Sequence, residues 1–292
     1  KISQNGTVLM ANRIGVMQGR LLAKYHGRYQ AHPVGYWQKE FQLAKNMGLD
    51  CIEFILDFND ADINPLLKPG GIDEIKALSE LTGVEVKTVC ADYFMEAPLH
   101  SEDQAIGDQS HEIMVQLLHN AAQLGVTDIV IPCVDNASLN CEESLHRFVK
   151  RIRCVTPVAE HLSVNLSLET DLPPDAFVQL LDACKSKRVT VNYDLGNSAA
   201  LGFDPVEELN AYGHSISDIH IKDRLKGGGP VLLGQGATDF DAFFTKLKDL
   251  NYLGPFIMQA YRDDEGVEIF KKQLAWIKPY LEDFGMNFTN IN

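Results

Sequence analysis

The sequence is short of basic residues, with 26 Lys and Arg against 40 Asp and Glu and a formal net charge of −14. Proteins that bind nucleic acid gain much of their affinity from Lys and Arg side chains that neutralise phosphates, so this balance argues against such a partner. The chain also lacks a recognisable secretory signal and any apolar run long enough to span a bilayer. We therefore expect a cytoplasmic protein with no membrane partner.

The cysteines lack any Cys-x-x-Cys spacing. All six are scattered along the chain, and Cys51, Cys90 and Cys133 fall within or at the ends of apolar segments. Free buried thiols in a reducing compartment explain this distribution better than disulfides do.

The remaining composition is that of a large globular core, with 45% hydrophobic residues and 23% charged residues in 292 positions. This length suits one α/β barrel, and we expect residues 1–292 to form a single domain. Residues 1–9 precede Met10 and the first clear strand, so we expect them to be disordered or additional to the native chain.

One pattern recurs along the chain: an amphipathic helix, a glycine, one or two residues, and an apolar strand. Gly48, Gly83, Gly125 and Gly254 occupy this joint. The expected strands lie at 13–17, 49–56, 84–90, 127–133, 164–170, 189–194, 215–222 and 255–260. Helices are expected at 72–82, 142–161, 173–185, 205–212 and 239–250, among others. Eight such units predict a parallel sheet closed into a (β/α)8 TIM barrel. A doubly wound open sheet is the weaker alternative, because no Gly-x-Gly-x-x-Gly follows an early strand.

Polar side chains end the last four predicted strands. They are Glu169, Asp194, His220 and Gln259. Barrel enzymes place their chemistry at the C-terminal ends of the strands, so these four groups are candidate ligands of one divalent metal ion. Three oxygen donors and one nitrogen suit Mn²⁺ or Mg²⁺, with Co²⁺ or Zn²⁺ as alternatives. The simpler interpretation is that such acids cap helices or lie in solvated loops.

Three motifs carry a family resemblance: Leu168-Glu-Thr170, Tyr193-Asp-Leu-Gly-Asn-Ser198 and His220-Ile-Lys-Asp-Arg224. Their order and spacing resemble the xylose isomerase-like barrels, and most of all the sugar and sugar-phosphate isomerases and epimerases among them. The resemblance implies that Glu169, Asp194 and His220 bind the metal and that Glu169 is also the catalytic base. It implies a sugar or sugar phosphate as the small-molecule substrate, and a homodimer or homotetramer.

Gln259 departs from the family pattern, which has a glutamate at the end of strand eight. A carboxamide can ligate a metal through its oxygen but cannot exchange a proton at neutral pH. This departure at a predicted catalytic position favours an aldose–ketose isomerisation over a two-glutamate epimerisation, for which a substitute acid is needed. Candidates for that acid are Glu53, Asp92, His32 and Lys222. Two further readings stay open: a dehydratase of a keto-sugar or inosose, and a barrel that binds a sugar without turning it over.

The same superfamily contains endonucleases that act at abasic sites in DNA. The resemblance implies that these carry a histidine three residues after the strand-six aspartate, where this chain has Asn197. They also need histidines at the ends of strands three and four, where this chain reads Cys90-Ala-Asp-Tyr93 and Pro132-Cys-Val134. Segment 224–236 contains no histidine either. We therefore reject the nuclease interpretation.

Several polar residues after the strands are expected to bind the substrate. The glycine-rich segment after Lys222 is either a backbone nest for a phosphate or carboxylate, or a flexible surface turn. The predicted substrate-binding residues are Arg20, His32, Glu53, Asn197, Lys222, Arg224 and Arg262.

Overall fold

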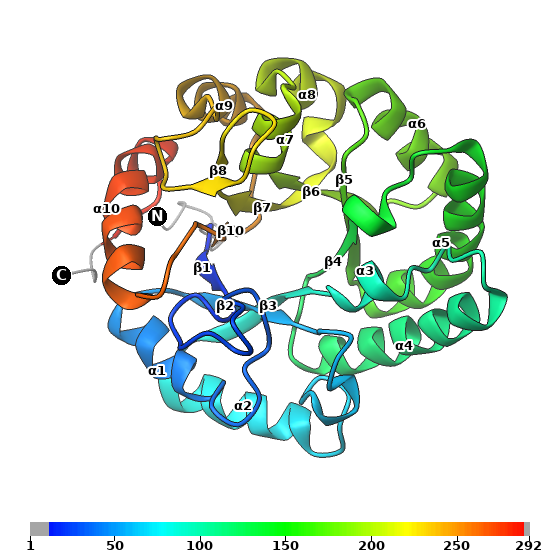
Figure 1. The fold of residues 1–292 in the computed structure, drawn as a ribbon, viewed down its shortest axis with the longest axis horizontal. Coiled ribbons are helices and arrows are strands. Elements are labelled where there is room, and N and C mark those ends of the chain that lie inside the picture. Colours follow the sequence, from blue (N-terminus) through cyan, green and yellow to red (C-terminus); the bar gives the residue numbers. More distant parts are fainter. Residues whose placement is uncertain (1–11, 289–292) are drawn as a thin grey trace, which may run out of the picture.

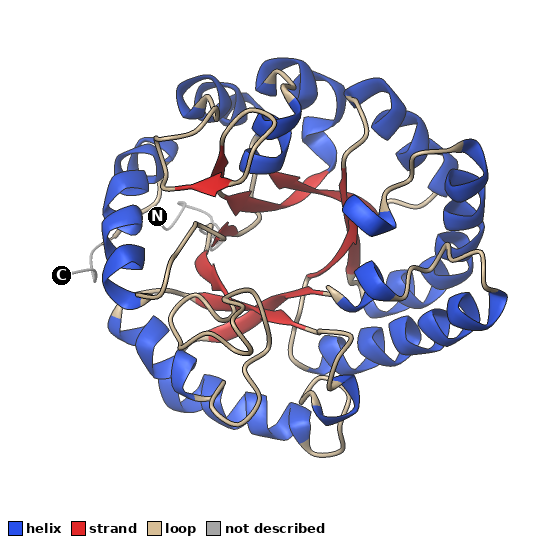
Figure 2. Ribbon diagram, viewed as in Figure 1, coloured by secondary structure: helices blue, strands red, loops and turns tan. Residues whose placement is uncertain are grey.

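A computed structural model describes residues 12–288, in which eight parallel strands close into one barrel. The strand order around the barrel is β1-β10-β7-β6-β5-β4-β3-β2, so the first and last barrel strands are neighbours. Helices form a ring around the strands (Figures 1 and 2). The predicted single-domain (β/α)8 barrel is confirmed, while the prediction for residues 1–9 lies outside the described residues.

The elements follow the predicted order. The barrel strands are β1 (Ile14–Met17), β2 (Cys51–Ile55), β3 (Glu85–Cys90), β4 (Asp128–Cys133), β5 (Asn165–Thr170), β6 (Val189–Asp194), β7 (Ile216–Ile221) and β10 (Phe256–Met258). The helices are α1 (Lys39–Asn46), α2 (Gly71–Thr82), α3 (Tyr93–Glu96), α4 (Gln104–Gln123), α5 (Glu142–Leu162), α6 (Pro174–Cys184), α7 (Leu195–Leu201), α8 (Pro205–Tyr212), α9 (Phe240–Leu247) and α10 (Val267–Phe284). A small antiparallel pair, β8 (Asp223–Arg224) and β9 (Pro230–Val231), follows β7.

The joints between helix and strand depend on glycine for two different reasons. Gly48, Gly83 and Gly125 have φ of 71°, 77° and 72°, the left-handed conformation that ends a helix at little cost for glycine. Gly254 was predicted to do the same, but there the left-handed residue is Asn251. Gly254 is instead required by packing, because a Cβ would lie 2.3 Å from the carbonyl oxygen of Ser217.

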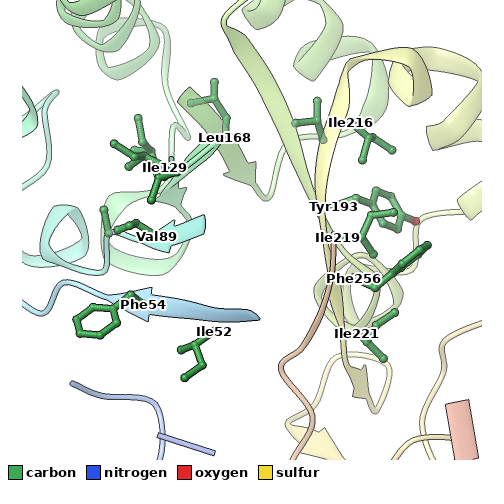
Figure 3. Packing of buried hydrophobic residues seen from close by; sticks show 14 of the residues in the cluster. Ile52, Phe54, Val89, Ile129, Leu168, Tyr193, Ile216, Ile219, Ile221 and Phe256 are labelled. Atoms are coloured by element: carbon green, nitrogen blue, oxygen red, sulfur yellow. The ribbon is translucent and has the colours of Figure 1, made fainter. Parts of the chain in front are cut away.

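Alternation along the strands divides the side chains into an outer and an inner set. Residues such as Ile52, Phe54 and Ile219 belong to the main core that packs against the helices (Figure 3). A small second cluster, which includes Met17 and Ile257, is formed by the alternate strand positions. The inner positions of β2, β5, β6 and β7 carry the polar side chains that make up the site.

The cysteines and the lengths of the helices bear on two further expectations. All six cysteines are free thiols, as predicted. Within residues 12–288, every helix is too short or too polar to cross a bilayer.

Candidate active site

Three of the predicted ligands converge at the C-terminal ends of adjacent strands. One donor atom each of Glu169 on β5, Asp194 on β6 and His220 on β7 lies within 4.8 Å of the other two. Asp194 and His220 are register partners in neighbouring strands, so strand pairing itself brings them together. All three side chains are buried.

The cluster contains donor atoms that nothing in the described chain satisfies. Asp194 Oδ2, His220 Nδ1 and Gln259 Oε1 are buried and have no hydrogen-bond partner. His220 Nδ1 and Asp194 Oδ2 are 3.7 Å apart. Gln259 donates through Nε2 to Gln30 Oε1 at 3.0 Å, which leaves its amide oxygen free to act as an acceptor or ligand. Buried polar atoms are almost always paired, so this set of oxygens and one imidazole nitrogen fits a divalent metal ion.

The second ring nitrogen of His220 is already occupied. Its Nε2 lies 2.6 Å from Oε1 of Glu53, and the other carboxylate oxygen of Glu53 accepts from Thr88 Oγ1, also at 2.6 Å. A carboxylate on one imidazole nitrogen fixes the ring and leaves the other nitrogen as the metal ligand. The prediction that Glu53 binds substrate is therefore corrected: it is fully buried, is not part of the cavity wall described below, and orients His220.

Negative charge is concentrated around this cluster. Burial, followed by the charge of Asp194, raises the pKa of Glu169 to about 7. Burial and the charge of Glu53 raise the pKa of Asp218 to about 8. Burial opposes the charged imidazole, but Glu53, Asp194 and Asp218 outweigh it and raise the pKa of His220 well above 6.5. A bound cation would relieve this repulsion between buried carboxylates.

Asn197 connects two of the carboxylates. Its side-chain amide donates to Glu169 Oε1 at 2.6 Å, and its backbone N–H donates to Asp194 Oδ1 at 2.8 Å. The amide oxygen of Asn197 accepts from Arg224 Nη1 at 2.9 Å. Lys222 Nζ lies 3.7 Å from Asp194 Oδ2. Asn197 is therefore a residue that holds both carboxylates in place.

A cavity of about 510 Å³ opens above the cluster, and we call it the main cavity. Glu169, Gln259, Asn197, Lys222 and Arg224 line it, in agreement with five of the predicted site residues. Its wall also contains residues that the sequence analysis did not assign to the substrate: Arg28, Gln30, Asp57, Phe58, Asp92, Met95, Glu96, Asp135 and Asp171.

A second cavity of about 350 Å³ shares part of this wall, and we call it the side cavity. It has three cationic side chains, Arg20, Arg28 and Lys222, and no carboxylate. Arg20 is buried, its Nη1 has no hydrogen-bond partner, and its guanidinium carbon lies 4.9 Å from the centre of the Tyr29 ring. Burial lowers the pKa of Arg20 to about 10. Its Nε and Nη2 donate to the carbonyl oxygens of Ala260 and Gln259 and to Gln30, all neutral acceptors, so the buried charge itself favours an anion nearby.

Two of the predicted substrate-binding residues lie elsewhere. His32 packs against Trp37 and Phe54 and is not part of either cavity wall. Arg262 donates to the carbonyl oxygens of Gly19, Arg20 and Leu22. These bonds satisfy the guanidinium with backbone, so Arg262 holds the loop that follows β1 rather than a ligand.

In the glycine-rich segment after Lys222, residues 227–229, two backbone N–H groups have partners within the chain: Gly227 donates to the carbonyl oxygen of Ala200 and Gly228 to that of Leu225, both at 2.8 Å. The segment that follows it, 234–238, is held by Asp223. The Asp223 carboxylate accepts backbone N–H bonds from Gly234, Gly236 and Thr238 at 2.9 to 3.1 Å. A Cβ on Gly236 would lie 2.1 Å from Asp223 Oδ1, so this close approach requires glycine. Asp223 thus holds the segment that leads into α9.

Some of the wall residues that were not predicted to bind substrate could have been found from the sequence, and others could not. Asp57 stands two residues after β2, where the strand-end rule applied to Glu169 would also have found it; Asp92, predicted only as a candidate acid, stands two residues after β3. Arg28 and Gln30 lie in the irregular connection between β1 and α1, and no periodicity marks them.

A closed parallel barrel with a carboxylate–histidine cluster at its strand ends is the architecture of (β/α)8 enzymes. The family model of the xylose isomerase-like TIM barrel matches residues 41–280, so the chain belongs to this family. The family predicted from the three motifs is confirmed.

Individual relatives agree with this assignment. The L-ribulose-5-phosphate 3-epimerase UlaE of Escherichia coli is 28% identical over 277 residues, covering 88% of this chain and 94% of that protein. The solved structure of an L-ribulose 3-epimerase has a TM-score of 0.72 at 18% identity, covering 94% of this chain and 95% of that one. The IolI protein, solved with a bound zinc atom, has a TM-score of 0.73 at 17% identity, covering 94% of this chain and all of the other. The prediction of an isomerase-class enzyme is confirmed.

Proposed function

We propose that this protein is a metal-dependent epimerase of a ketose phosphate, acting by removal of the proton next to the carbonyl. The observation that carries the proposal is the cluster of Glu169, Asp194 and His220 beside the main cavity, with unpaired donor atoms on Asp194 and His220. The curated relative that acts on L-ribulose 5-phosphate supports the reaction class.

Glu169, Asp194, His220 and Gln259 are the proposed metal ligands. The donor set is mostly oxygen, which favours Mn²⁺ or Mg²⁺, while the zinc in the related IolI structure keeps Zn²⁺ and Co²⁺ as alternatives. When bound, the divalent ion would polarise the substrate carbonyl and so acidify the neighbouring carbon-bound proton.

Glu169 is the proposed base. It reaches the wall of the main cavity, and burial followed by the charge of Asp194 raises its pKa above the ordinary value of a carboxyl. The hydrogen bond from Asn197 to Oε1 holds one carboxylate oxygen, so the other is available to take the proton and leave an enediolate.

The side cavity supports a phosphorylated substrate. A neutral sugar would leave Arg20 buried without an anion, whereas a phosphate could accept from the guanidinium and from Lys222 and Arg28. Because the two cavities share Gln30, Lys222 and Gln259, one short-chain ketose phosphate can occupy both.

A second candidate is an aldose–ketose isomerase, favoured by Gln259, since one base on one face is enough for transfer between C1 and C2. A dehydratase of a keto-sugar or inosose uses the same first step. A barrel that only binds the sugar would bind it and the metal without proton exchange.

The test is hydrogen exchange in D₂O. Protein loaded with Mn²⁺ is incubated with a panel of ketoses and their 5-phosphates, and deuterium is located by NMR. We expect label at C3 together with the inverted epimer, and faster exchange with the phosphates. Label at C1 or C2 with appearance of an aldose would instead establish the isomerase.

Glu169→Gln should abolish this exchange, because the amide cannot accept the proton, while Mn²⁺ binding measured by calorimetry persists. Glu96→Gln is the matched control, since Glu96 is exposed at the mouth of the same cavity. Full exchange in Glu169→Gln would remove Glu169 from the role of base, and no exchange with any substrate would overturn the proposal.

A further inference from the structure

Inversion at one carbon needs two groups. A proton leaves from one face of the substrate, and another must arrive on the opposite face. A single carboxylate on one side cannot do both. Gln259 occupies the strand-eight position but carries an amide, which neither gives nor takes a proton at neutral pH.

One carboxyl of the main cavity is placed to supply the second proton. Asp92 follows β3 and lines the cavity that Glu169 also lines. The two carboxyls come from different parts of the wall, with β4 between their strands. A substrate seated in the cavity can therefore contact both carboxyls, each from its own part of the wall.

A pair of carboxamides connects Asp92 to the strand-eight position. Gln259 Nε2 donates to Gln30 Oε1 at 3.0 Å, and Gln30 Nε2 donates to Asp92 Oδ2 at 3.2 Å. The thiol of Cys90 lies 3.3 Å from Asp92 Oδ1. The carboxyl is thus held in the wall, two hydrogen bonds away from the amide of Gln259.

The other acids of the wall are less suited to this step. Asp57 is paired with Arg28 at 3.4 Å, and Asp171 accepts from Ser138 at 2.8 Å. Glu96 and Asp135 are exposed to solvent. Asp92, in contrast, has no cationic side chain within 4.0 Å among residues 12–288.

The remaining candidates from the sequence are also excluded by position. Glu53 is bonded to His220 and fully buried, and His32 lies outside both cavities. Lys222 lies beside Asp194, on the side of the metal ligands.

We propose that Asp92 is the second acid–base group of the reaction, returning a proton to the face opposite Glu169; this inference rests on the proposed epimerase function. In the forward direction Glu169 takes the C3 proton, the electron pair of the C–H bond enters the enediolate, and the Asp92 carboxyl gives its proton to C3 from the other side. Glu169 ends protonated and Asp92 ionised. Exchange of both protons with water restores the starting state.

The surroundings of Asp92 favour its protonated form. Burial, and then the negative charge of Asp57, raise its pKa, although the bonds from Gln30 and Cys90 act in the opposite direction. A substrate that displaces water from the cavity strengthens the effect of burial.

The test compares exchange with inversion in Asp92→Asn. The variant is incubated with Mn²⁺ and the accepted ketose 5-phosphate in D₂O, and NMR follows both deuterium at C3 of the original epimer and formation of the new epimer. We expect C3 exchange within about threefold of wild type, because Glu169 is intact, and epimer formation slower by about 10²-fold or more. Asp175→Asn, at an exposed position of α6 outside both cavity walls, is the control for loss of one carboxylate and should retain both rates.

Each outcome bears on a different claim. If Asp92→Asn forms the epimer at the wild-type rate while exchange continues, Asp92 is not the second acid and the epimerase proposal stands. If Asp92→Asn binds Mn²⁺ normally but loses exchange and inversion equally, Asp92 does not act at the return step alone, which overturns its assigned role. Absence of exchange in the wild-type protein overturns the proposed function and the role of Asp92 together.

Discussion

The contact between Glu53 and His220 allows a quantitative prediction about metal affinity. Glu53→Gln keeps the side-chain shape and an oxygen that can accept from His220 Nε2, at present 2.6 Å from the carboxylate. The new amide group can donate to the Thr88 hydroxyl, which turns from donor to acceptor. The barrel should therefore fold, and the change isolates the loss of one negative charge behind the imidazole.

The expected magnitude follows from the two kinds of hydrogen bond. A hydrogen bond to an ionised acceptor contributes roughly 1.5–3 kcal/mol and one to a neutral acceptor about 1 kcal/mol. The free energy of metal binding, which depends on how His220 is oriented and how basic it is, should therefore weaken by about 1–2 kcal/mol. This corresponds to Mn²⁺ binding weaker by about 10-fold, within the 10- to 100-fold range typical of such partners.

Calorimetric titration of chelator-treated protein with MnCl₂ measures this loss, with Glu80→Gln on the exposed face of α2 as the charge control. The same carboxylate raises the pKa of His220, so a proton competes with the metal more strongly in the wild type than in the variant. The ratio of the Mn²⁺ affinity of the wild type to that of Glu53→Gln should therefore be larger at pH 8.5 than at pH 6.5. Equal dissociation constants for wild type and Glu53→Gln at pH 8.5 would refute the reasoning that Glu53 prepares His220 as a ligand.

Two further predictions concern residues of the barrel interior. Gln259→Glu should bind Mn²⁺ as tightly as the wild type or more tightly, because a carboxylate is the stronger ligand for a hard cation. A large drop in Mn²⁺ affinity, measured by the same titration, would show that Gln259 is not a ligand. Burial, and then the charge of Asp218, raise the pKa of Asp128 to about 6, above its unfolded value of 3.8, so the folded state loses stability as pH rises between these values. Asp128→Asn should remove this loss, which reaches about 3 kcal/mol by pH 7 in the wild type. Measured by urea unfolding, the free energy of unfolding of the variant relative to that of the wild type should therefore rise by this amount from pH 4 to pH 7. A difference that stays constant with pH would contradict the prediction.

The fold could be predicted from the sequence because its signals are local and repeat. Each strand is an apolar segment after a helix stop such as Gly83, and eight repeats leave few topologies open. The cluster of Glu169, Asp194 and His220 was found by the same logic, since strand ends of a closed barrel meet at one face.

The parts of the site that were missed depend on long-range contacts. Glu53 lies in the middle of β2, and only the closed barrel, which brings its carboxylate 2.6 Å from His220 Nε2, distinguishes it from a substrate-binding residue. Arg262 looks like an anion-binding residue until the carbonyl oxygens of Gly19 and Arg20 are seen beside it. The glycine-rich segment looks like an anion nest until the carbonyl oxygens of Ala200 and Leu225 are seen to accept from Gly227 and Gly228.

The contacts of Arg262 also set an order of events during synthesis. The loop after β1 emerges from the ribosome early, but its partners are made late. The carbonyl oxygens of Gly19 and Arg20 accept from Arg262, and Arg20 Nε donates to the carbonyl oxygen of Ala260. Some 240 residues must be made before these partners exist. Earlier β–α units can fold as they appear, but the wall of the substrate cavity is completed only when the last unit seals the seam between β10 and β1. A partly synthesised chain would therefore lack both the closed barrel and the complete wall of the cavity.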